Sequence, residues 1–163
     1  PRHMQEPQAL KMIVKKLSQM KSTPEGNIMP DFTMNDINGK PISALAEIGK
    51  NKITVIDFWA SWCGPCRVEM PHMVRMYNGY KDKGLGILGI SLDSKREAWE
   101  AASKELGVAW PQMSDLRGWD NAAARMFNVQ SIPQTIVVDS NRKILKKGLR
   151  GEELETFIKS LME

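Results

Sequence analysis

Cysteine occurs twice in the 163-residue chain, at Cys63 and Cys66, within the sequence Trp-Cys-Gly-Pro-Cys. Two thiols at this spacing can carry out disulfide exchange: one thiolate attacks a partner's disulfide, and the other thiol resolves the mixed disulfide that forms. A structural zinc site is the alternative chemistry, but such a site takes four ligands. His72 and His3 are the only histidines that could complete it. The spacing therefore favours a redox-active disulfide, with no metal and no other cofactor.

The residues on either side of the cysteines predict a strand followed by a helix. Residues 53–61 form an apolar run, rich in β-branched side chains, that is too short for a helix and typical of a buried strand. Beyond Cys66 the apolar residues recur at the spacing of one helical face: Met70, Met73, Val74 and Tyr77. Cys63 is therefore expected at the N-terminus of this helix, where free N–H groups and the helix dipole stabilise a thiolate. We predict that Cys63 attacks the partner's disulfide and that Cys66 resolves the product.

The composition is that of one ordinary globular domain. Apolar residues make up 42% of the chain and charged residues 26%, which is typical of a protein with a single hydrophobic core. The net charge of +4 comes without a basic block, which argues against a nucleic-acid partner. No apolar run approaches the length that spans a membrane.

A longer motif resembles the active-site segment of the thioredoxin family. It runs from Asp57 to Cys66 as Asp-Phe-Trp-Ala-Ser-Trp-Cys-Gly-Pro-Cys and is followed by Pro71. Farther upstream, Asn38-Gly39 between two extended segments predicts a β-hairpin. This hairpin is similar to the one that opens two branches of the thioredoxin fold, the TlpA-like thiol–disulfide interchange proteins of the bacterial envelope and the peroxiredoxins.

The resemblance implies an α/β protein with a thioredoxin-like fold, in which helices flank a central mixed sheet, with an N-terminal β-hairpin and an inserted helix–strand element. Periodicity and turn residues place the later elements: strands at 85–93, 134–139 and 143–147, helices at 95–106, 120–127 and 154–161, and an extended piece at 108–111. The inserted element falls between the cysteines and Pro133, as it does in TlpA-like proteins.

Residues 29–163 are expected to form the thioredoxin-like domain. An upstream apolar stripe has helical spacing: Leu10, Ile13, Val14 and Leu17. A helix is therefore predicted at residues 5–21, and residues 5–28 are interpreted as an N-terminal helix and linker. Residues 1–4, Pro-Arg-His-Met, resemble a cloning remnant and are set apart from the fold. A signal peptide or membrane tether in a longer precursor is compatible with this reading.

Asp57 places a carboxyl group inside an otherwise apolar strand. A carboxyl buried without a partner keeps its proton to higher pH, so its pKa is expected above the ordinary value; a strand-end position open to solvent is the alternative. The resemblance implies that Asp57 exchanges a proton with the resolving thiol of Cys66. Thioredoxins also carry a lysine near this acid on the adjacent strand, and residues 85–93 contain none. Arg67 and Glu69 are expected on the solvated face of the active-site helix.

Pro133 stands at the start of a predicted strand, a position that a proline in the common trans form also occupies. In Ser-Ile-Pro-Gln-Thr its place matches the cis-proline of the thioredoxin family, which lies beside the cysteine pair. The resemblance implies a cis bond after Ile132 and a backbone there that pairs with an extended substrate. Trp62, Gly64 and Pro65 are expected to complete the substrate-binding surface, with Trp62 as an apolar collar rather than a simple packing residue.

The leading hypothesis is an enzyme, a thiol–disulfide oxidoreductase that reduces or exchanges disulfides in partner proteins through Cys63 and Cys66. A thiol-dependent peroxidase of peroxiredoxin type is the alternative, although peroxiredoxins place threonine or serine where this chain has Ala60. A binding module that uses the cis-proline groove without redox turnover is the third hypothesis.

The expected partners follow from the leading hypothesis. They are disulfide-containing client proteins and an upstream thiol electron donor. By resemblance to the TlpA-like branch, we expect the bacterial periplasm or cell envelope, with the cytoplasm as the alternative compartment. We also expect the protein to be a monomer.

Overall fold

The computed structural model describes residues 24–163, so the helix predicted at residues 5–21 lies outside the described part of the chain, as do residues 1–4. Five strands form the central sheet in the order β5-β4-β3-β6-β7. They are β3 (Ile53–Trp59), β4 (Leu85–Ser91), β5 (Gln112–Met113), β6 (Gln134–Asp139) and β7 (Ile144–Lys147). The central strand, β3, pairs parallel with β4 and antiparallel with β6. The sheet is therefore mixed, as predicted.

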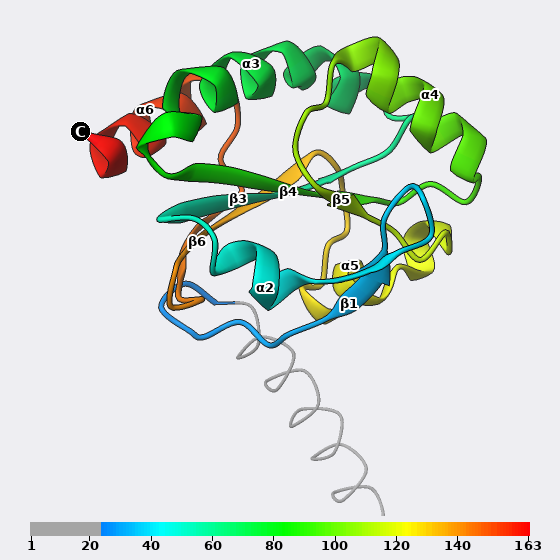
Figure 1. Ribbon diagram of the computed structural model, residues 1–163, viewed down its shortest axis with the longest axis horizontal. Coiled ribbons are helices and arrows are strands. Elements are labelled where there is room, and N and C mark those ends of the chain that lie inside the picture. Colours follow the sequence, from blue (N-terminus) through cyan, green and yellow to red (C-terminus); the bar gives the residue numbers. More distant parts are fainter. Residues whose placement is uncertain (1–23) are drawn as a thin grey trace, which may run out of the picture.

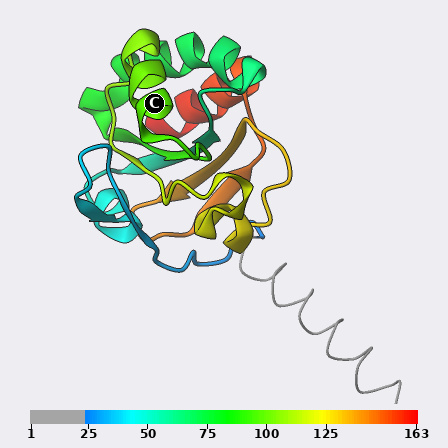
Figure 2. The same cartoon turned by 90° about the vertical axis from the view of Figure 1, so that its right-hand side faces the viewer.

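Helices cover both faces of this sheet (Figure 1). One face carries α3 (Gly64–Tyr80), α4 (Arg96–Leu106) and α6 (Gly151–Met162). The opposite face carries α2 (Ala44–Ile48), α5 (Ala122–Met126) and the hairpin strand β1 (Thr33–Asn35). Figure 2, turned by 90°, shows the same division into layers. Within residues 24–163, no helix is both long enough and apolar enough to cross a membrane.

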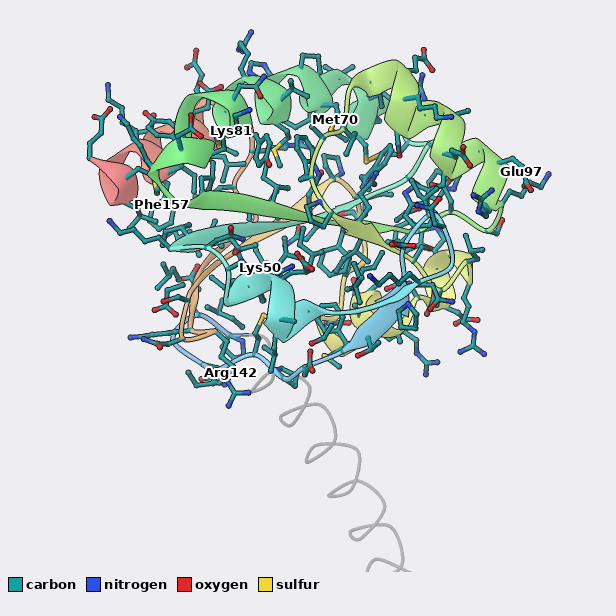
Figure 3. All side chains as sticks on the ribbon, in the orientation of Figure 1. Lys50, Met70, Lys81, Glu97, Arg142 and Phe157 are labelled. Atoms are coloured by element: carbon teal, nitrogen blue, oxygen red, sulfur yellow. A yellow bond between two sulfur atoms is a disulfide. The ribbon has the colours of Figure 1, made fainter. Side chains whose placement is uncertain are left out.

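Cover on both faces explains the composition of β3. All seven of its residues are buried, as in strands with helices on either side. The strand continues through α3 into β4, which gives the crossover connection that a parallel pair requires. Of the residues labelled in Figure 3, Met70 of α3 is buried, whereas Lys81 and Glu97 are exposed.

The predicted hairpin is confirmed. Its strands, β1 and β2 (Pro41–Ser43), pair antiparallel with Met34 opposite Ile42. Gly39 adopts a φ of 82° in the turn, a conformation that glycine reaches without steric cost. The Asp36 carboxylate accepts a hydrogen bond from the N–H of Asn38 at 2.9 Å, which closes the turn.

The extended piece predicted at 108–111 was placed too early. The strand at this point, β5, begins at Gln112, which lies opposite Gly89 of β4. Pro111 has no N–H for a sheet and contributes only its carbonyl, which accepts a hydrogen bond from the Gly89 N–H at 2.9 Å.

The helix predicted at 120–127 is interrupted. A 3-10 turn at Gly118–Asp120 precedes α5. Asn121 separates them because its side chain accepts a hydrogen bond from the Ala124 N–H and so begins a new helix.

Candidate active site at the start of helix α3

The two cysteines lie where the central strand passes into α3. Residues 60–63 form the connection, and the Cys63 N–H donates to the Ala60 carbonyl at 3.2 Å. Cys63 is the N-terminal capping residue of α3 and forms a disulfide with Cys66, inside the first turn. The Cys66 N–H donates to the Cys63 sulfur at 3.2 Å. The predicted placement of the pair is confirmed, and once reduced, Cys63 has the N–H donor and helix dipole that favour its thiolate.

A second chain segment, 69 residues farther along, meets the cysteines. The Cys63 sulfur lies 3.6 Å from the carbonyl oxygen of Ile132, and the Ile132–Pro133 peptide bond is cis. Ile132 and Pro133 are half-buried, whereas Gly64 and Pro65, which lie between the two cysteines in the chain, are exposed. The fold therefore brings together the cysteines and the two segments that the sequence predicted beside them.

Asp57 is buried, with 3% of its area exposed. It lies in β3 opposite Gly89 of β4 and Thr135 of β6. Burial, and to a lesser degree the negative charge of Glu69, raises the pKa of the Asp57 carboxyl from 3.8 to about 7. The expected buried acid with a high pKa is thus present. A carboxyl with a pKa near neutrality can both accept and return a proton at physiological pH.

Glu69 and Arg67 are not simple surface residues, and the expectation that placed both on a solvated face was wrong. Glu69 is half-buried and accepts a hydrogen bond from the backbone N–H of Gly151, where α6 begins. Arg67 donates to the Ser61 carbonyl at 3.1 Å and pairs with Glu105. Helical periodicity predicts which side of α3 these residues occupy, but not that other elements pack against that side.

Asp93 is a buried acid that the sequence analysis missed, with 1% of its area exposed. Its carboxylate accepts hydrogen bonds from the backbone N–H and the hydroxyl of Ser61 and from the hydroxyl of Ser91. These donors replace water around a buried charge. Because Ser61 lies two residues before Cys63, Asp93 fixes the connection that carries the cysteines. An aspartate at the end of a predicted strand was the available signal.

We expect Asp93→Ala to lower the free energy of unfolding by about 2–3 kcal/mol, because the Ser61 N–H and two hydroxyls lose their acceptor. Urea unfolding of the oxidised protein measures the change. Asp82→Ala is the matched control, since Asp82 is exposed and its side chain makes no recorded hydrogen bond within residues 24–163. Equal stability of the two variants would contradict a structural role for Asp93.

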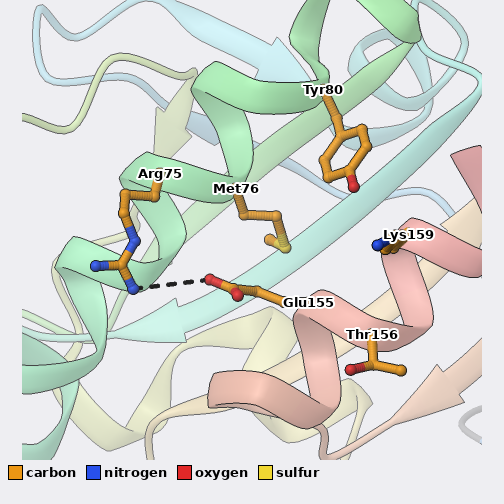
Figure 4. A pocket seen from close by; sticks show the side chains of 6 residues that line it. All are labelled: Arg75, Met76, Tyr80, Glu155, Thr156 and Lys159. Atoms are coloured by element: carbon orange, nitrogen blue, oxygen red, sulfur yellow. Dashed lines mark ion pairs between the residues drawn. The ribbon is translucent and has the colours of Figure 1, made fainter.

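A groove between α3 and α6 lies away from the cysteines (Figure 4). It has a volume of about 300 Å³ and is crossed by an ion pair between Arg75 and Glu155 at 3.9 Å. Along α3, Met76 in its lining is about 20 Å from Cys63 at the helical rise of 1.5 Å per residue. The described residues 24–163 contain no cluster of three or more His, Cys, Asp or Glu side chains that could hold a metal ion.

The sequence is similar to a protein family and to several bacterial thiol-disulfide oxidoreductases. The model of a family described as AhpC/TSA matches residues 26–147. Thiol-disulfide oxidoreductase ResA of Bacillus subtilis (strain 168) is 30% identical over 141 residues, which cover 86% of this chain and 75% of the relative. The protein of the same name from Geobacillus kaustophilus (strain HTA426) is 27% identical over 139 residues, covering 83% of this chain and 77% of the relative.

Solved structures agree with the sequence comparison. The thioredoxin domain of a thiol-disulfide oxidoreductase from Bacteroides vulgatus superimposes with a TM-score of 0.79 and 31% identity, covering 87% of this chain and all of that one. A thiol-disulfide oxidoreductase from Bacteroides fragilis gives a TM-score of 0.77 and 34% identity, and the match covers 83% of this chain and 99% of that one. These names support the oxidoreductase hypothesis over the peroxidase alternative. The chain therefore belongs to the AhpC/TSA family, within which it is a thioredoxin-fold thiol–disulfide oxidoreductase similar to ResA and to the TlpA-like proteins.

Proposed function

We propose that the protein reduces disulfides in client proteins, with Cys63 as the attacking thiolate and Cys66 as the resolving thiol. The observation that carries this proposal is the position of the Cys63 sulfur at the N-terminus of α3, where it accepts the Cys66 N–H at 3.2 Å. A negative charge on that sulfur is stabilised by the N–H and by the helix dipole.

In the first step, the Cys63 thiolate attacks one sulfur of the client's disulfide. A bond forms between Cys63 and that sulfur, the client's sulfur–sulfur bond breaks, and the other client sulfur leaves as a thiolate. The attacked sulfur must approach Cys63 along the axis of the breaking bond. Only 5% of the Cys63 area is exposed, so the client's access to this sulfur decides which disulfides react.

In the second step, Cys66 releases the client. Its thiol gives a proton to the Asp57 carboxylate and attacks the Cys63 sulfur, so that the Cys63–Cys66 disulfide forms and the client's second sulfur leaves. The client gains two electrons, and the enzyme ends in the disulfide form that the structure shows. Asp57 suits this role because its pKa of about 7 lets it take up and return the proton near neutral pH.

The surface around the pair supplies the client's binding site. The carbonyl of Ile132 beside Pro133 offers an acceptor to an extended segment, while Trp62, Gly64 and Pro65 form the opposite wall. Trp62 is 54% exposed and immediately precedes Cys63. An aromatic ring in that position excludes water from the attacked disulfide.

The proposal also covers the electron donor, the cellular compartment, the oligomeric state and the bounds of the active domain. An upstream dithiol protein would return the enzyme to its reduced form by the reverse exchange. We place the protein in the periplasm or cell envelope of a bacterium, as a monomer whose longer precursor carries a membrane tether, with residues 29–163 as the active domain. Likeness to TlpA-like proteins supports these assignments.

Two assays on the wild-type protein test the proposal. With dithiothreitol as the electron source, we expect catalytic reduction of insulin disulfides at a rate well above that of dithiothreitol alone. Hydrogen peroxide should disappear no faster than with dithiothreitol alone, because Ala60 gives no hydroxyl near the attacking sulfur. Rapid peroxide turnover with little insulin reduction would instead favour the peroxidase alternative.

A further inference from the structure

Two exposed aromatic rings meet at the segment that carries the disulfide. Residues 24–163 contain five large apolar side chains that are exposed, and four belong to two short segments: Trp62 and Val68 to one, Leu116 and Trp119 to the other. The segments meet where the rings of Trp62 and Trp119 lie with centroids 6.0 Å apart. Single exposed apolar residues are ordinary, but a cluster on one face marks an interaction surface.

The second segment is held in place rather than loose. The side-chain amide of Asn121, which is fully buried, donates to the Asp115 carboxylate at 3.1 Å. The N–H of Leu116 donates to the Ser114 hydroxyl at 3.0 Å. Trp119 lies within this braced segment, yet 48% of its area is exposed. Its ring is therefore presented to solvent by a preorganised backbone, which lowers the entropy lost when a partner binds.

The first segment is braced as well. Asp93 fixes Ser61 next to Trp62 through the hydrogen bonds described above. The Ser114 hydroxyl donates to the Ser91 carbonyl at 2.8 Å, so the segments that carry Trp62 and Trp119 are both hydrogen-bonded to the end of β4. Neither indole N–H has a recorded hydrogen-bond partner among residues 24–163, so the pair serves no visible polar network.

The chemistry of disulfide exchange identifies the partner that binds to this surface. A client sulfur must reach Cys63, and Cys63 directly follows Trp62, so the chain flanking the client's cysteine lies across the aromatic pair. A membrane or a second copy of this protein in the same place would block the reaction.

We propose that Trp119, together with Trp62, binds an aromatic or branched aliphatic side chain next to the reactive cysteine of the client. This inference rests on the proposed function and gives it a substrate class. Trp119 comes from the segment between β5 and α5, so this segment contributes one wall of the client site.

Two disulfide-bonded peptides test the inference, identical except for phenylalanine or serine beside the attacked cysteine. Each rate of reduction by the pre-reduced enzyme is divided by the rate with dithiothreitol, which removes differences in intrinsic reactivity. We expect the wild type to prefer the phenylalanine peptide about fivefold, the scale of one aromatic contact. Trp119→Ala should remove the preference, and Trp119→Phe should retain most of it.

Ile28→Ala is the matched control, because Ile28 is also exposed and apolar but lies outside the cluster; this variant should keep the full preference. Thermal unfolding checks that each variant is folded. Equal rates for both peptides with the wild type, or a preference that survives Trp119→Ala, would overturn the inference. So would a wild-type dimer or vesicle binding that Trp119→Ala abolishes. A wild type that reduces neither peptide nor insulin would instead contradict the proposed function.

Discussion

Replacing Cys63 with serine is expected to lower the rate of client reduction by about a thousandfold or more, since the nucleophilic thiolate is lost. A serine hydroxyl at the start of α3 does not ionise near neutral pH, and a helix dipole and one N–H donor are too weak to change that. Insulin reduction with dithiothreitol measures the effect. The fold should remain, because serine can cap the helix in place of Cys63.

Cys66→Ser is the informative counterpart. It keeps the attacking thiol and removes the resolving thiol, so the reaction should stop after the first step with the client bound to Cys63. Non-reducing gels and mass spectrometry of the intact complex detect this mixed disulfide. Full insulin turnover by Cys63→Ser would show that Cys63 is not the nucleophile. A client trapped on Cys66 when Cys63 is absent would show that the two cysteines have the opposite roles.

Asp57→Asn is expected to slow release of the client from the mixed disulfide by about a hundredfold at pH 7, a typical loss for a positioned general base. With wild-type protein, the release rate should rise with pH and level off above about pH 7, as the Asp57 carboxyl with its pKa of about 7 becomes ionised. The variant should lack this rise. Single-turnover release, followed from pH 5.5 to 8.5, gives both profiles; identical profiles would exclude Asp57 as the base.

The same substitution should stabilise the oxidised protein at high pH. The Asp57 pKa is about 7 when folded, against about 3.9 in an unfolded chain. Ionisation therefore opposes folding: the cost is absent below the unfolded value, grows between the two values and is constant above pH 7. We expect Asp57→Asn to gain a few kcal/mol, in order of magnitude, at pH 8, and little at pH 4, by urea unfolding.

Glu69→Gln tests the contribution of the Glu69 charge to the raised pKa of Asp57. Burial is the main cause of the raised Asp57 pKa, and the charge of Glu69 is the smaller one. Removing that charge should move the release profile to lower pH without abolishing it. A shift to higher pH would contradict the sign of this interaction.

Local sequence patterns predicted the turns, strands and helices that depend only on residues close together in the chain. The Asn38-Gly39 turn, the strand before Cys63 and the amphipathic helix after it each follow from spacing within about a dozen positions. The high pKa of Asp57 was also predictable, because an acid in the middle of an apolar strand has no route to water.

Features that depend on contacts between distant segments were not predicted. Glu69 acts on Asp57 and binds the first N–H of α6, although helical spacing alone suggested a solvated position. Trp119 meets Trp62 only because the segment between β5 and α5 folds back beside the segment that carries the cysteines. The strand β4 carries no lysine, and the nearby charge that acts on Asp57 is negative.

Burial of β3 on both faces determines how the active site is lost on heating. Amide hydrogens of such a central strand exchange with solvent chiefly when the whole domain opens, whereas edges and loops open at much lower cost. The short connection that carries Cys63 follows β3 directly. Asp93, just after β4, accepts a hydrogen bond from this connection and holds it in place. Heat inactivation should then coincide with global melting, without an earlier stage in which an intact scaffold has already lost its reactive centre.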